Sequence, residues 1–466
     1  MPTTTRERIK PFLLPEICKG CGRCIDSCAK HCIALGHEIN SQTGLIPVEI
    51  HLEDCNACGL CIDACPEPYG LLPIREGAEF ELQDPSKLFG ARRTTAPVPI
   101  RIPGEVIALP KTEPMVLKGT YASAIGAILA GCRHVYGYPI TPSTEGAELM
   151  SKLLPKLDGV FLQAVSEVAT VNIMYGCGGA GLPCMTFTSS PGFSLMVEGI
   201  SYMVGSEVPA VFVNVMRGGP GLGNIAPEQA DVKLACRGLG HGNTHGIVLA
   251  PSTPQEMLDL TMLSFELAFR YRNPVVIVSD GYLGQMTGRV TLPRTMLKPP
   301  LPEWAVWGDA MHRRNLINSI ELDEHDLEER NRQLNAKYRR IAESEQRADV
   351  FQGDDAEVLL VAFGTPARMA KGAVRALREK GVAAGLFRPV TLWPFPVDRL
   401  AALLPNLKRI IVVEASNGQL EDEMRLALSY GALPHPQIEN LRHFGGVLPQ
   451  QSEIVDLVLG RGEVAA

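Results

Sequence analysis

The sequence predicts an α/β protein with a small cysteine-rich module near its N-terminal end. Two observations predict this fold class. Nine of the thirteen cysteines lie between positions 18 and 65. Downstream, two stretches that begin near Met115 and Glu357 alternate short, wholly apolar segments with helical ones. Continuous apolar strands separated by helices are typical of a parallel sheet that is covered on both faces.

Two runs of cysteines repeat one spacing, C-x2-C-x2-C-x3-C. They consist of Cys18, Cys21, Cys24 and Cys28, and of Cys55, Cys58, Cys61 and Cys65. The first three thiolates of each run can bind three irons of one [4Fe–4S] cluster, while the fourth ligates the other cluster. One cluster is therefore assigned to Cys18, Cys21, Cys24 and Cys65, and its partner to Cys55, Cys58, Cys61 and Cys28. On this pattern residues 16–66 resemble a bacterial two-cluster ferredoxin, with Ala29 where that family usually has proline.

A zinc site or a disulfide framework is the alternative interpretation of these cysteines. Zinc sites usually combine C-x2-C pairs with histidine, and a disulfide framework does not need two identical triplets. Iron–sulfur ligation is therefore the prediction. Cys32 falls outside the repeated spacing, and we expect it to be a small buried residue.

Composition limits the remaining possibilities. The apolar share of 45% and the charged share of 20% are those of an ordinary globular protein. A net charge of −7 argues against nucleic acid as a partner. The N-terminal residues lack the apolar core of a signal peptide, and no apolar run is long enough for a membrane span. With eight cysteines assigned to iron, the expected location is the reducing cytoplasm.

The chain is expected to divide into five parts. These are a two-cluster ferredoxin-like domain (1–75), a proline-rich connector (76–114), a first α/β domain (115–296), a charged helical connector (297–351) and a second α/β domain (352–466). Because each proline fixes φ and removes an N–H donor, the first connector should be extended and irregular. The charged connector is expected to be a helix with a solvated face.

The two α/β domains have the following expected elements. In the first, helices are predicted at 119–131, 143–154, 167–175 and 254–271, and strands at 134–138, 160–163, 184–188, 210–215, 247–250 and 275–279. In the second, strands are predicted at 358–363, 384–387 and 410–413, and helices at 366–379 and 420–430. Ser166 can cap the helix that begins at Glu167, where a carboxylate suits the helix dipole.

Three polar stretches follow strands of the first α/β domain. They are YPITPS (138–143), VSEV (165–168) and MRGGPGLGNIAPEQ (216–229). Loops at the carboxyl ends of parallel strands form the ligand crevice of such sheets, so Thr141, Glu167 and Arg217 are candidate site residues. Each also has a structural interpretation, as a turn residue, a helix-dipole acid and a surface cation. From the residues alone, both interpretations stay open.

A family resemblance favours the site. Residues from about 115 to 466 resemble the α subunit of 2-oxoacid:ferredoxin oxidoreductases, which are thiamine-diphosphate enzymes. The resemblance rests on the three stretches above, on TSSPGFSLM (188–196) and on VEAS (413–416). It implies a pyrimidine-binding first domain and a second domain like the C-terminal domain of transketolases. It also implies that Glu167 hydrogen-bonds the aminopyrimidine ring nitrogen of the cofactor. Thr141 and Arg217 are expected to bind the 2-oxoacid, and Thr141 is also expected to bind the cofactor.

The same resemblance predicts partners. A thiamine diphosphate site needs a Mg²⁺-binding loop of the G-D-G…N-N type, and SDGYLG (279–284) is not followed by paired asparagines. The cofactor and Mg²⁺ are therefore expected to be shared with a separate β subunit. A γ subunit, coenzyme A, and ferredoxin or another low-potential acceptor are further expected partners. The expected reaction converts a 2-oxoacid to acyl-CoA and CO2, with electrons leaving through the two clusters.

Two other classes of function are alternatives to this one. One is a non-catalytic electron-transfer subunit, which the presence of Thr141, Glu167 and Arg217 disfavours. The other is a different iron–sulfur enzyme, such as an acid–thiol ligase or a nicotinamide reductase, for which the chain lacks a phosphate-binding loop. The loop 216–229 and GHGN (240–243) look most like branched-chain members of the family. 2-Oxoglutarate and aryl-2-oxoacids are the alternative substrates.

Overall fold

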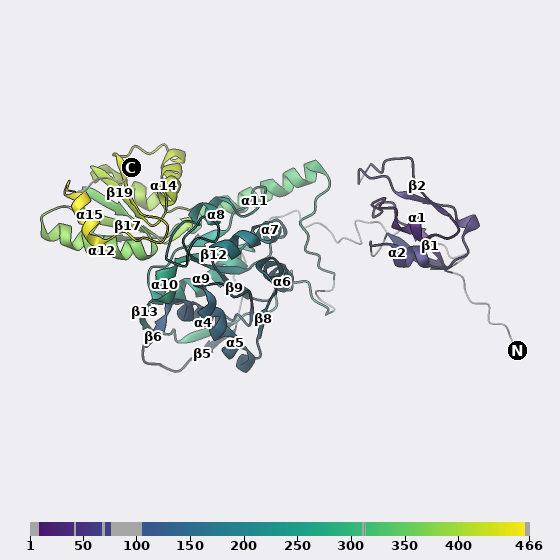
Figure 1. The fold of residues 1–466 in the computed structure, drawn as a ribbon, viewed down its shortest axis with the longest axis horizontal. Coiled ribbons are helices and arrows are strands. Elements are labelled where there is room, and N and C mark those ends of the chain that lie inside the picture. The colour runs from purple at the N-terminus through teal and green to yellow at the C-terminus, as the bar shows by residue number, and fades with distance from the viewer. Residues whose placement is uncertain are drawn as a thin grey trace. The chain divides into compact units, whose positions relative to one another are not determined.

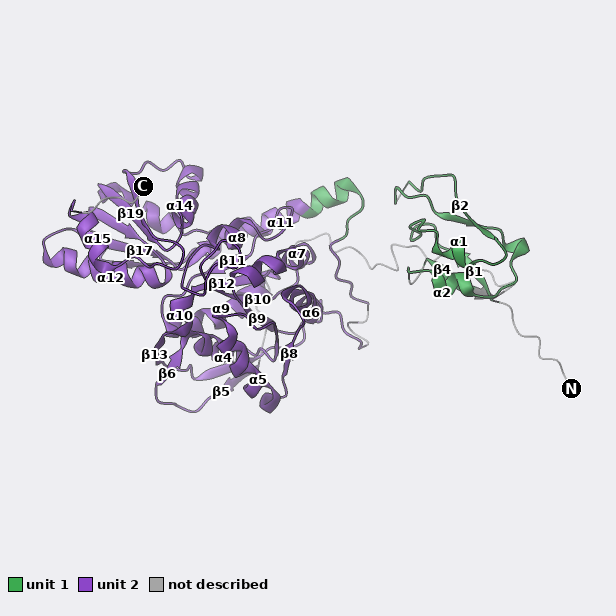
Figure 2. Ribbon diagram, in the orientation of Figure 1, with its two compact units in different colours: residues 1–92, 320–330 green, residues 93–319, 331–466 purple. Residues whose placement is uncertain are grey.

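The computed structural model describes residues 9–41, 43–67, 70–75, 105–309, 312 and 314–461. Two compact units are distinguished: residues 1–92 with 320–330, here called the N-terminal unit, and residues 93–319 with 331–466, the main unit (Figure 2). Of the predicted connector 76–114, residues 76–104 lie outside the described residues, as do residues 1–8 of the predicted first domain.

The N-terminal unit is built from two similar halves. Its strands β1 (Ile9–Leu13) and β4 (Leu71–Arg75) pair antiparallel, as do β2 (Ile33–Leu35) and β3 (Val48–Ile50). The helices within its described residues 9–75 are α1 (Arg23–Ser27), η1 (Leu52–Asp54) and α2 (Leu60–Ala64). Both α-helices begin after a glycine with positive φ, Gly22 at 77° and Gly59 at 83°. The apolar core is small and consists largely of the cysteines themselves with a few aliphatic residues, so the unit is organised around its thiols.

Among the described residues, the first large sheet has seven strands in the order β18-β11-β12-β10-β9-β7-β8 (Figure 1). They are β7 (His134–Gly137), β8 (Val160–Gln163), β9 (Cys184–Thr188), β10 (Val211–Met216), β11 (Ile247–Leu249), β12 (Val275–Asp280) and β18 (Thr391–Trp393). All pairings are parallel except that of β18 with β11. The carboxyl ends of β7 to β10 therefore meet at one edge, where the three polar stretches begin.

Helices connect and cover these strands. They are α4 (Gly119–Leu129), α5 (Thr144–Leu153), η2 (Leu154–Leu157), α6 (Glu167–Gly179), α7 (Ser190–Ser206), α8 (Val232–Arg237), α9 (Pro254–Tyr271) and α10 (Gly281–Gln285). The pair α4 and α9 and the pair α6 and α7 pack together. Two antiparallel ribbons, β5 (Glu105–Ala108) with β14 (Thr295–Lys298) and β6 (Met115–Lys118) with β13 (Thr287–Val290), complete this part. The described end of the proline-rich connector thus forms a strand on the main unit.

The second sheet has the order β15-β17-β16-β19-β20 in the described part of the chain. Its strands are β15 (Ala348–Phe351), β16 (Val358–Val361), β17 (Ala384–Pro389), β19 (Arg409–Glu414) and β20 (Ile438–Arg442). Its helices are α12 (Gly364–Glu379), α13 (Val397–Ala401), η3 (Leu404–Asn406), α14 (Gln419–Tyr430) and α15 (Gln451–Val458). One apolar cluster continues from the first sheet into this one, while a second cluster fills the space under α12 and α15. The two α/β parts consequently share a core.

The charged connector contains helix α11 (Glu324–Ser344). The expectation of a solvated helix holds for much of its length, but one stripe is buried. Tyr338 meets a stacked pair of rings, His245 on Trp393, whose centroids lie 4.5 Å apart. Lys337 is also buried and pairs with the buried Glu207 at 3.3 Å. Because an unpaired buried charge is costly, this pair holds residues 331–344 of the helix within the main unit.

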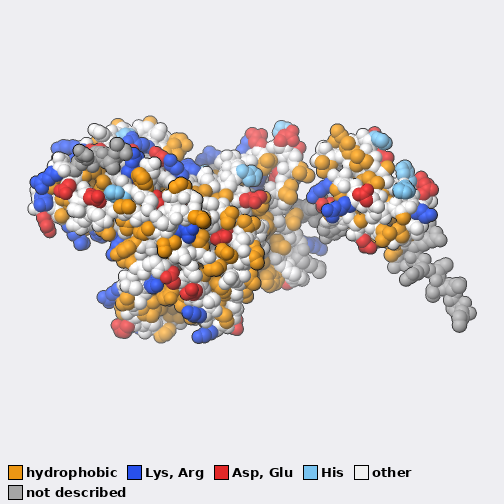
Figure 3. All heavy atoms as spheres, viewed as in Figure 1, with side chains coloured by type: hydrophobic (Ala, Val, Ile, Leu, Met, Phe, Trp, Pro, Cys, Tyr) orange, Lys and Arg blue, Asp and Glu red, His pale blue; other side chains and the backbone are white. Residues whose placement is uncertain are grey.

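Side chains of both charge signs are interspersed on the face of the main unit seen in Figure 3, so neither sign dominates there. Within the described ranges, none of the helices combines the length and apolar character that crossing a bilayer requires.

Candidate functional site

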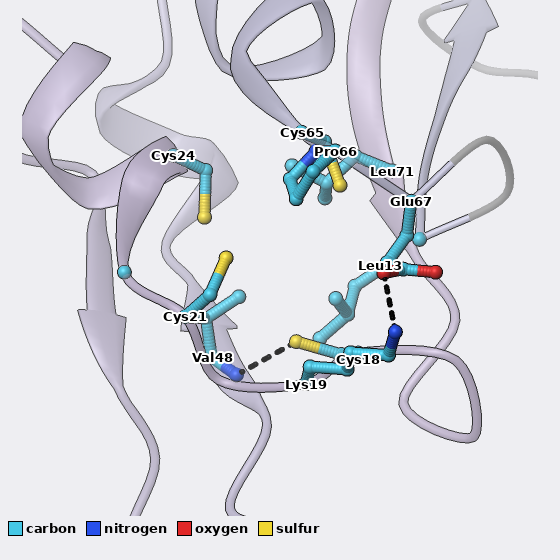
Figure 4. A pocket seen from close by; sticks show the side chains of 12 residues that line it. Leu13, Cys18, Lys19, Cys21, Cys24, Val48, Cys65, Pro66, Glu67 and Leu71 are labelled. Atoms are coloured by element: carbon cyan, nitrogen blue, oxygen red, sulfur yellow. Dashed lines mark hydrogen bonds and ion pairs between the residues drawn. The ribbon is translucent and has the colours of Figure 1, made fainter. Parts of the chain in front are cut away.

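Four cysteines from both halves of the N-terminal unit line one cavity. Figure 4 shows the sulfurs of Cys18, Cys21, Cys24 and Cys65 around this space. The first three come from the loop that leads into α1 and from α1 itself, and Cys65 follows α2. These are the four cysteines that the crossed assignment gives to one cluster.

The other four predicted ligands line a second cavity. It contains Cys28, Cys55, Cys58 and Cys61, together with Cys32. Cys32 is buried, as expected, but sequence reasoning did not place it beside the predicted cluster. Its backbone N–H donates to Cys28 Sγ at 3.3 Å.

Backbone N–H groups also point at sulfurs of both groups. Val48 donates to Cys18 Sγ at 3.5 Å, and Ala57 donates to Cys55 Sγ at 3.4 Å. Hydrogen bonds to sulfur stabilise negative charge on a cluster and tune its potential. In the described part of the chain, no group of His, Cys, Asp or Glu is arranged to hold a single metal ion. Four thiols spread around one cavity, with N–H donors, fit a cubane.

Burial governs the protonation of two of these thiols. Burial raises the pKa of Cys24, and it raises the pKa of Cys61 to about 11, with nearby Cys18 and Cys55 adding in each case. Such thiols carry their protons at neutral pH unless a cation replaces them. They are therefore poorly suited to act as free nucleophiles, and a cluster would have to displace their protons.

Glu167 lies at the first turn of α6, after the edge strand β8. Ser166 caps the helix as predicted, because its Oγ accepts the N–H of Ala169 at 3.2 Å. The side chain of Glu167 is only 5% exposed, and its carboxylate makes no hydrogen bond to any described residue. The two oxygens of this carboxylate are not among the fully enclosed polar atoms of the described residues, so they stay accessible on one side. This observation favours a ligand at Glu167 over a purely helix-stabilising role.

The first turn of α7 leaves room for that carboxylate. A methyl group at Gly192 would lie 2.5 Å from Glu167 Oε1 and 2.5 Å from Thr188 Oγ1. The hydroxyls of Thr188 and Ser189 are buried, and in the described part of the chain neither has a hydrogen-bond partner. The sequence pattern marks this segment as part of a motif without giving these hydroxyls a role; the available signal is their place at the end of a buried strand, where Thr188 is the last residue of β9 and Ser189 follows it.

The structure brings Thr141 and Arg217 together, although through the backbone of Thr141. Arg217 Nη1 donates to the carbonyl oxygen of Thr141 at 2.9 Å, and Nη2 donates to that of Leu222 at 3.2 Å. Arg217 Nε is buried and has no hydrogen-bond partner among the described residues. The guanidinium is thus fixed at two nitrogens and keeps a donor for another acceptor.

The loop of Arg217 also reaches the start of α7. The N–H of Arg217 donates to Ser190 Oγ at 3.1 Å, and that hydroxyl donates to Asp231 Oδ2 at 2.6 Å. Burial raises the pKa of Asp231, against the hydrogen bonds from Ser190 and Asn214. No hydrogen bond between described residues joins Glu167 to Thr141 or Arg217. The first turn of α7 connects their surroundings.

Comparisons with known proteins agree with this arrangement. A model of the 4Fe-4S dicluster domain matches residues 17–68. A model described as pyruvate flavodoxin/ferredoxin oxidoreductase, thiamine diphosphate-binding, matches 125–343, and pyruvate:ferredoxin oxidoreductase core domain II matches 356–454. The predicted fold class is confirmed.

Curated relatives cover most of the main unit. Ketoisovalerate oxidoreductase subunit VorB of Methanothermobacter thermautotrophicus is 45% identical over 344 residues, which are 74% of this chain and 96% of the relative. 2-Oxoglutarate synthase subunit KorA of Archaeoglobus fulgidus is 36% identical over 360 residues, which are 75% of this chain and 99% of the relative. The solved 2-oxoglutarate:ferredoxin oxidoreductase of Magnetococcus marinus, with 2-oxoglutarate, coenzyme A and succinyl-CoA bound, aligns with a TM-score of 0.67 and 26% identity. That alignment covers 75% of this chain and 65% of the solved one. By these matches the chain belongs to the 2-oxoacid:ferredoxin oxidoreductases, as a subunit that joins a two-[4Fe–4S] module to a thiamine-diphosphate-binding domain.

Proposed function

We propose that this chain supplies the pyrimidine-binding and 2-oxoacid-binding half of the active site, and that a separate β subunit supplies the diphosphate half with Mg²⁺. The observation that carries the proposal is Glu167 at the carboxyl edge of the first sheet, a residue only 5% exposed whose carboxylate has no hydrogen-bond partner among the described residues. In the proposed reaction a 2-oxoacid and coenzyme A give acyl-CoA, CO2, two electrons and one proton. The electrons pass singly to the two clusters.

Glu167 has the properties that an aminopyrimidine ring needs from its partner. The carboxylate accepts a hydrogen bond and exchanges a proton at the ring nitrogen, and the unpartnered hydroxyls of Thr188 and Ser189 line the same turn. Bound thiamine diphosphate supplies the carbon nucleophile and the electron sink for decarboxylation. The residues present therefore fit the pyrimidine end of the cofactor, and Glu167 is proposed as the catalytic residue of this chain.

Arg217 is proposed to bind the carboxylate of the 2-oxoacid, with Thr141 beside it. A guanidinium suits a carboxylate because its planar donors match two oxygens, and Arg217 Nε is buried without a hydrogen-bond partner in the part of the chain that the structure describes. Thr141 is exposed and follows β7 at the same sheet edge.

Exposed apolar side chains around the site support a partner subunit there. Val165 is 88% exposed and Leu222 is 82% exposed, and Val168, Leu195 and Ile225 are also exposed. Large apolar side chains grouped on a surface commonly mark a protein interface. We propose that the β subunit covers this surface. A γ subunit, a ferredoxin-type acceptor and a cytoplasmic location complete the proposal by analogy with the family.

A branched-chain 2-oxoacid is the proposed substrate. The VorB relative is more similar to this chain than the KorA relative, at 45% against 36% identity. In the loop 216–229 Arg217 is the single cation, while Leu222 and Ile225 expose apolar side chains. A second carboxylate, as in 2-oxoglutarate, is bound most strongly by a second charged donor, and this loop supplies none. 2-Oxoglutarate and aryl-2-oxoacids are the alternatives to be tested.

The test is the visible spectrum of the anaerobic complex, assembled with its partner subunits. The clusters should bleach with a branched-chain 2-oxoacid plus coenzyme A, and not with either compound alone. Glu167→Gln should lower the rate roughly 10²–10⁴-fold at unchanged iron content, because the amide cannot exchange the proton. A Glu167→Gln rate within about threefold of wild type, at full cofactor occupancy, would contradict the proposed role.

A further inference from the structure

The loop that carries Arg217 is hydrogen-bonded, through a buried carboxylate, to the part of the chain that contains the second sheet. This part is called the second α/β part. Glu228 is only 3% exposed. Its Oε2 accepts the N–H of Gly219 at 2.8 Å, and its Oε1 accepts the N–H of Gly445 at 3.0 Å. One side chain therefore joins the first turn of the loop to the segment that follows β20.

Asn224 makes the second half of this connection. Its Nδ2 donates to the carbonyl oxygen of Gly445 at 2.9 Å, while its Oδ1 accepts the N–H of Ala226 at 2.9 Å. Both the N–H and the carbonyl of Gly445 are thus bound by the same loop. The next residue, Gly446, has a φ of +97°, and a methyl group there would lie 2.4 Å from Ala226 Cβ. The two segments are in close backbone contact.

The shape of the loop determines where the guanidinium of Arg217 is held. The N–H of Asn224 donates to the carbonyl of Gly218 at 3.0 Å, and a methyl group at Gly223 would lie 1.8 Å from that carbonyl oxygen. This tight turn places Leu222, whose carbonyl accepts Arg217 Nη2. Loosening the turn would release one of the two fixed nitrogens of the guanidinium.

We propose that Glu228 and Asn224 are positioning residues that hold Arg217 ready for the 2-oxoacid, using Gly445 of the second α/β part as their anchor. The inference rests on the proposed role of Arg217 in binding the substrate. The second α/β part would then contribute to substrate affinity without touching the substrate.

The chemistry of position 228 makes the proposal testable with a small change. A carboxylate offers an acceptor oxygen to each of the two N–H groups, and hydrogen bonds to a charged acceptor are the stronger kind. Glutamine has one acceptor oxygen, and its NH2 group would face an N–H donor. Glu228→Gln therefore breaks one of the two bonds while preserving the volume of the side chain.

The experiment compares Glu228→Gln with wild type in the assembled complex. The KM for the 2-oxoacid should rise and kcat/KM should fall by roughly 10- to 100-fold, with kcat changing less, because a misplaced positioning group weakens substrate capture. Hydrogen–deuterium exchange should become faster in peptides that contain Gly219 and Gly445. Iron content should be unchanged.

The matched control is Glu423→Gln. Glu423 is also buried and also joins the two α/β parts, since it accepts from Arg237 Nη2 at 2.9 Å and from Arg237 Nε at 3.1 Å. It lies on α14, and it makes no hydrogen bond to the loop 216–229. The control should leave the KM and the exchange at Gly219 unchanged. Equal KM changes in both variants would overturn the proposal, because general loosening of the two parts would then explain them.

The variant Arg217→Ala distinguishes a failure of the proposed substrate role of Arg217 from a failure of the proposed positioning role of Glu228. If Arg217→Ala leaves the KM unchanged, the proposed substrate role of Arg217 is wrong. If Arg217→Ala raises the KM and Glu228→Gln does not, only the positioning inference is wrong. Should Glu228→Gln fail to assemble, Asn224→Asp is the second variant. This exposed residue would lose its donor to Gly445 but keep its acceptor, and the same rise in KM is expected.

Discussion

A methyl group added at Gly192 should disable the active site while leaving the helix that carries it stable. The ideal Cβ of Gly192→Ala would lie 2.5 Å from Glu167 Oε1 and 2.9 Å from Glu167 Cγ. Ordinary contacts of a Cβ begin near 3.4 Å, so the carboxylate must move by about 0.9 Å. A displacement of about 1 Å at a reacting group can cost about 10²-fold in rate, or about 2.7 kcal/mol of transition-state stabilisation.

Helix propensity acts in the opposite direction. Alanine is favoured over glycine within a helix by about 0.8–1 kcal/mol, so Gly192→Ala has no intrinsic reason to unfold α7. Gly176 in α6 provides the matched control, because a methyl group there meets no atom within 4 Å. Gly176→Ala should stabilise its helix and retain full activity.

The assay is the initial rate of cluster reduction by 2-oxoacid and coenzyme A in the assembled complex. Thermal unfolding and iron content are measured on the same preparations. Activity of Gly192→Ala within about threefold of wild type, at normal cofactor occupancy, would refute the argument that the Glu167 carboxylate must occupy this position. Equal losses in both alanine variants would point instead to a general effect on folding.

Two further predictions concern the clusters and the acid sensitivity of the main unit. Cys28→Ala should damage the cluster built on the second cysteine run, because Cys28 lines that cavity; EPR that shows loss of the other cluster would contradict the crossed assignment. Burial, with a smaller effect of nearby Arg237, lowers the pKa of His245 to about 4 from 6.5. Between pH 6.5 and about pH 4 the unfolded chain therefore binds more protons than the folded chain, so the free energy of unfolding decreases as the pH falls through this range. The expected loss between pH 7 and pH 5 is about 2 kcal/mol. His245→Phe, which keeps a ring against Trp393, should show a smaller decrease of Tm over that range; identical pH profiles would contradict the assignment.

Local sequence signals predicted the central elements well. Helix α9 spans Pro254–Tyr271 as expected, because Thr253 caps it by accepting the N–H of Glu256 at 3.1 Å. Strands β8 and β9 also have their expected bounds, since their apolar runs are bounded by turn residues. The cysteine spacing indicated which thiols would share a cavity.

Long-range pairings could not be predicted in the same way. Strand β18 is only three residues long and pairs with β11, which lies far away in the sequence, so no local pattern marks it. The bonds of Glu228 to Gly219 and Gly445 depend on two loops meeting, and glutamate in a polar loop gives no sign of burial. Thr141, Glu167 and Arg217 were identified from the ends of strands, whereas the hydrogen bonds of Arg217 to the carbonyl oxygens of Thr141 and Leu222 became apparent only in three dimensions.

The pairing of β18 with β11 limits how this protein can be divided or recombined. A fragment that stopped before β15 would expose the edge of β11, and an exposed strand edge readily pairs with other chains. It would also lose Trp393, which covers His245. When the second α/β part is exchanged between relatives, residues 390–394 should therefore be exchanged together with β11, the strand of the first sheet that they pair with. In evolutionary terms, the shared strand is one place where the two parts must change together, as are their shared core and the contacts of Glu228.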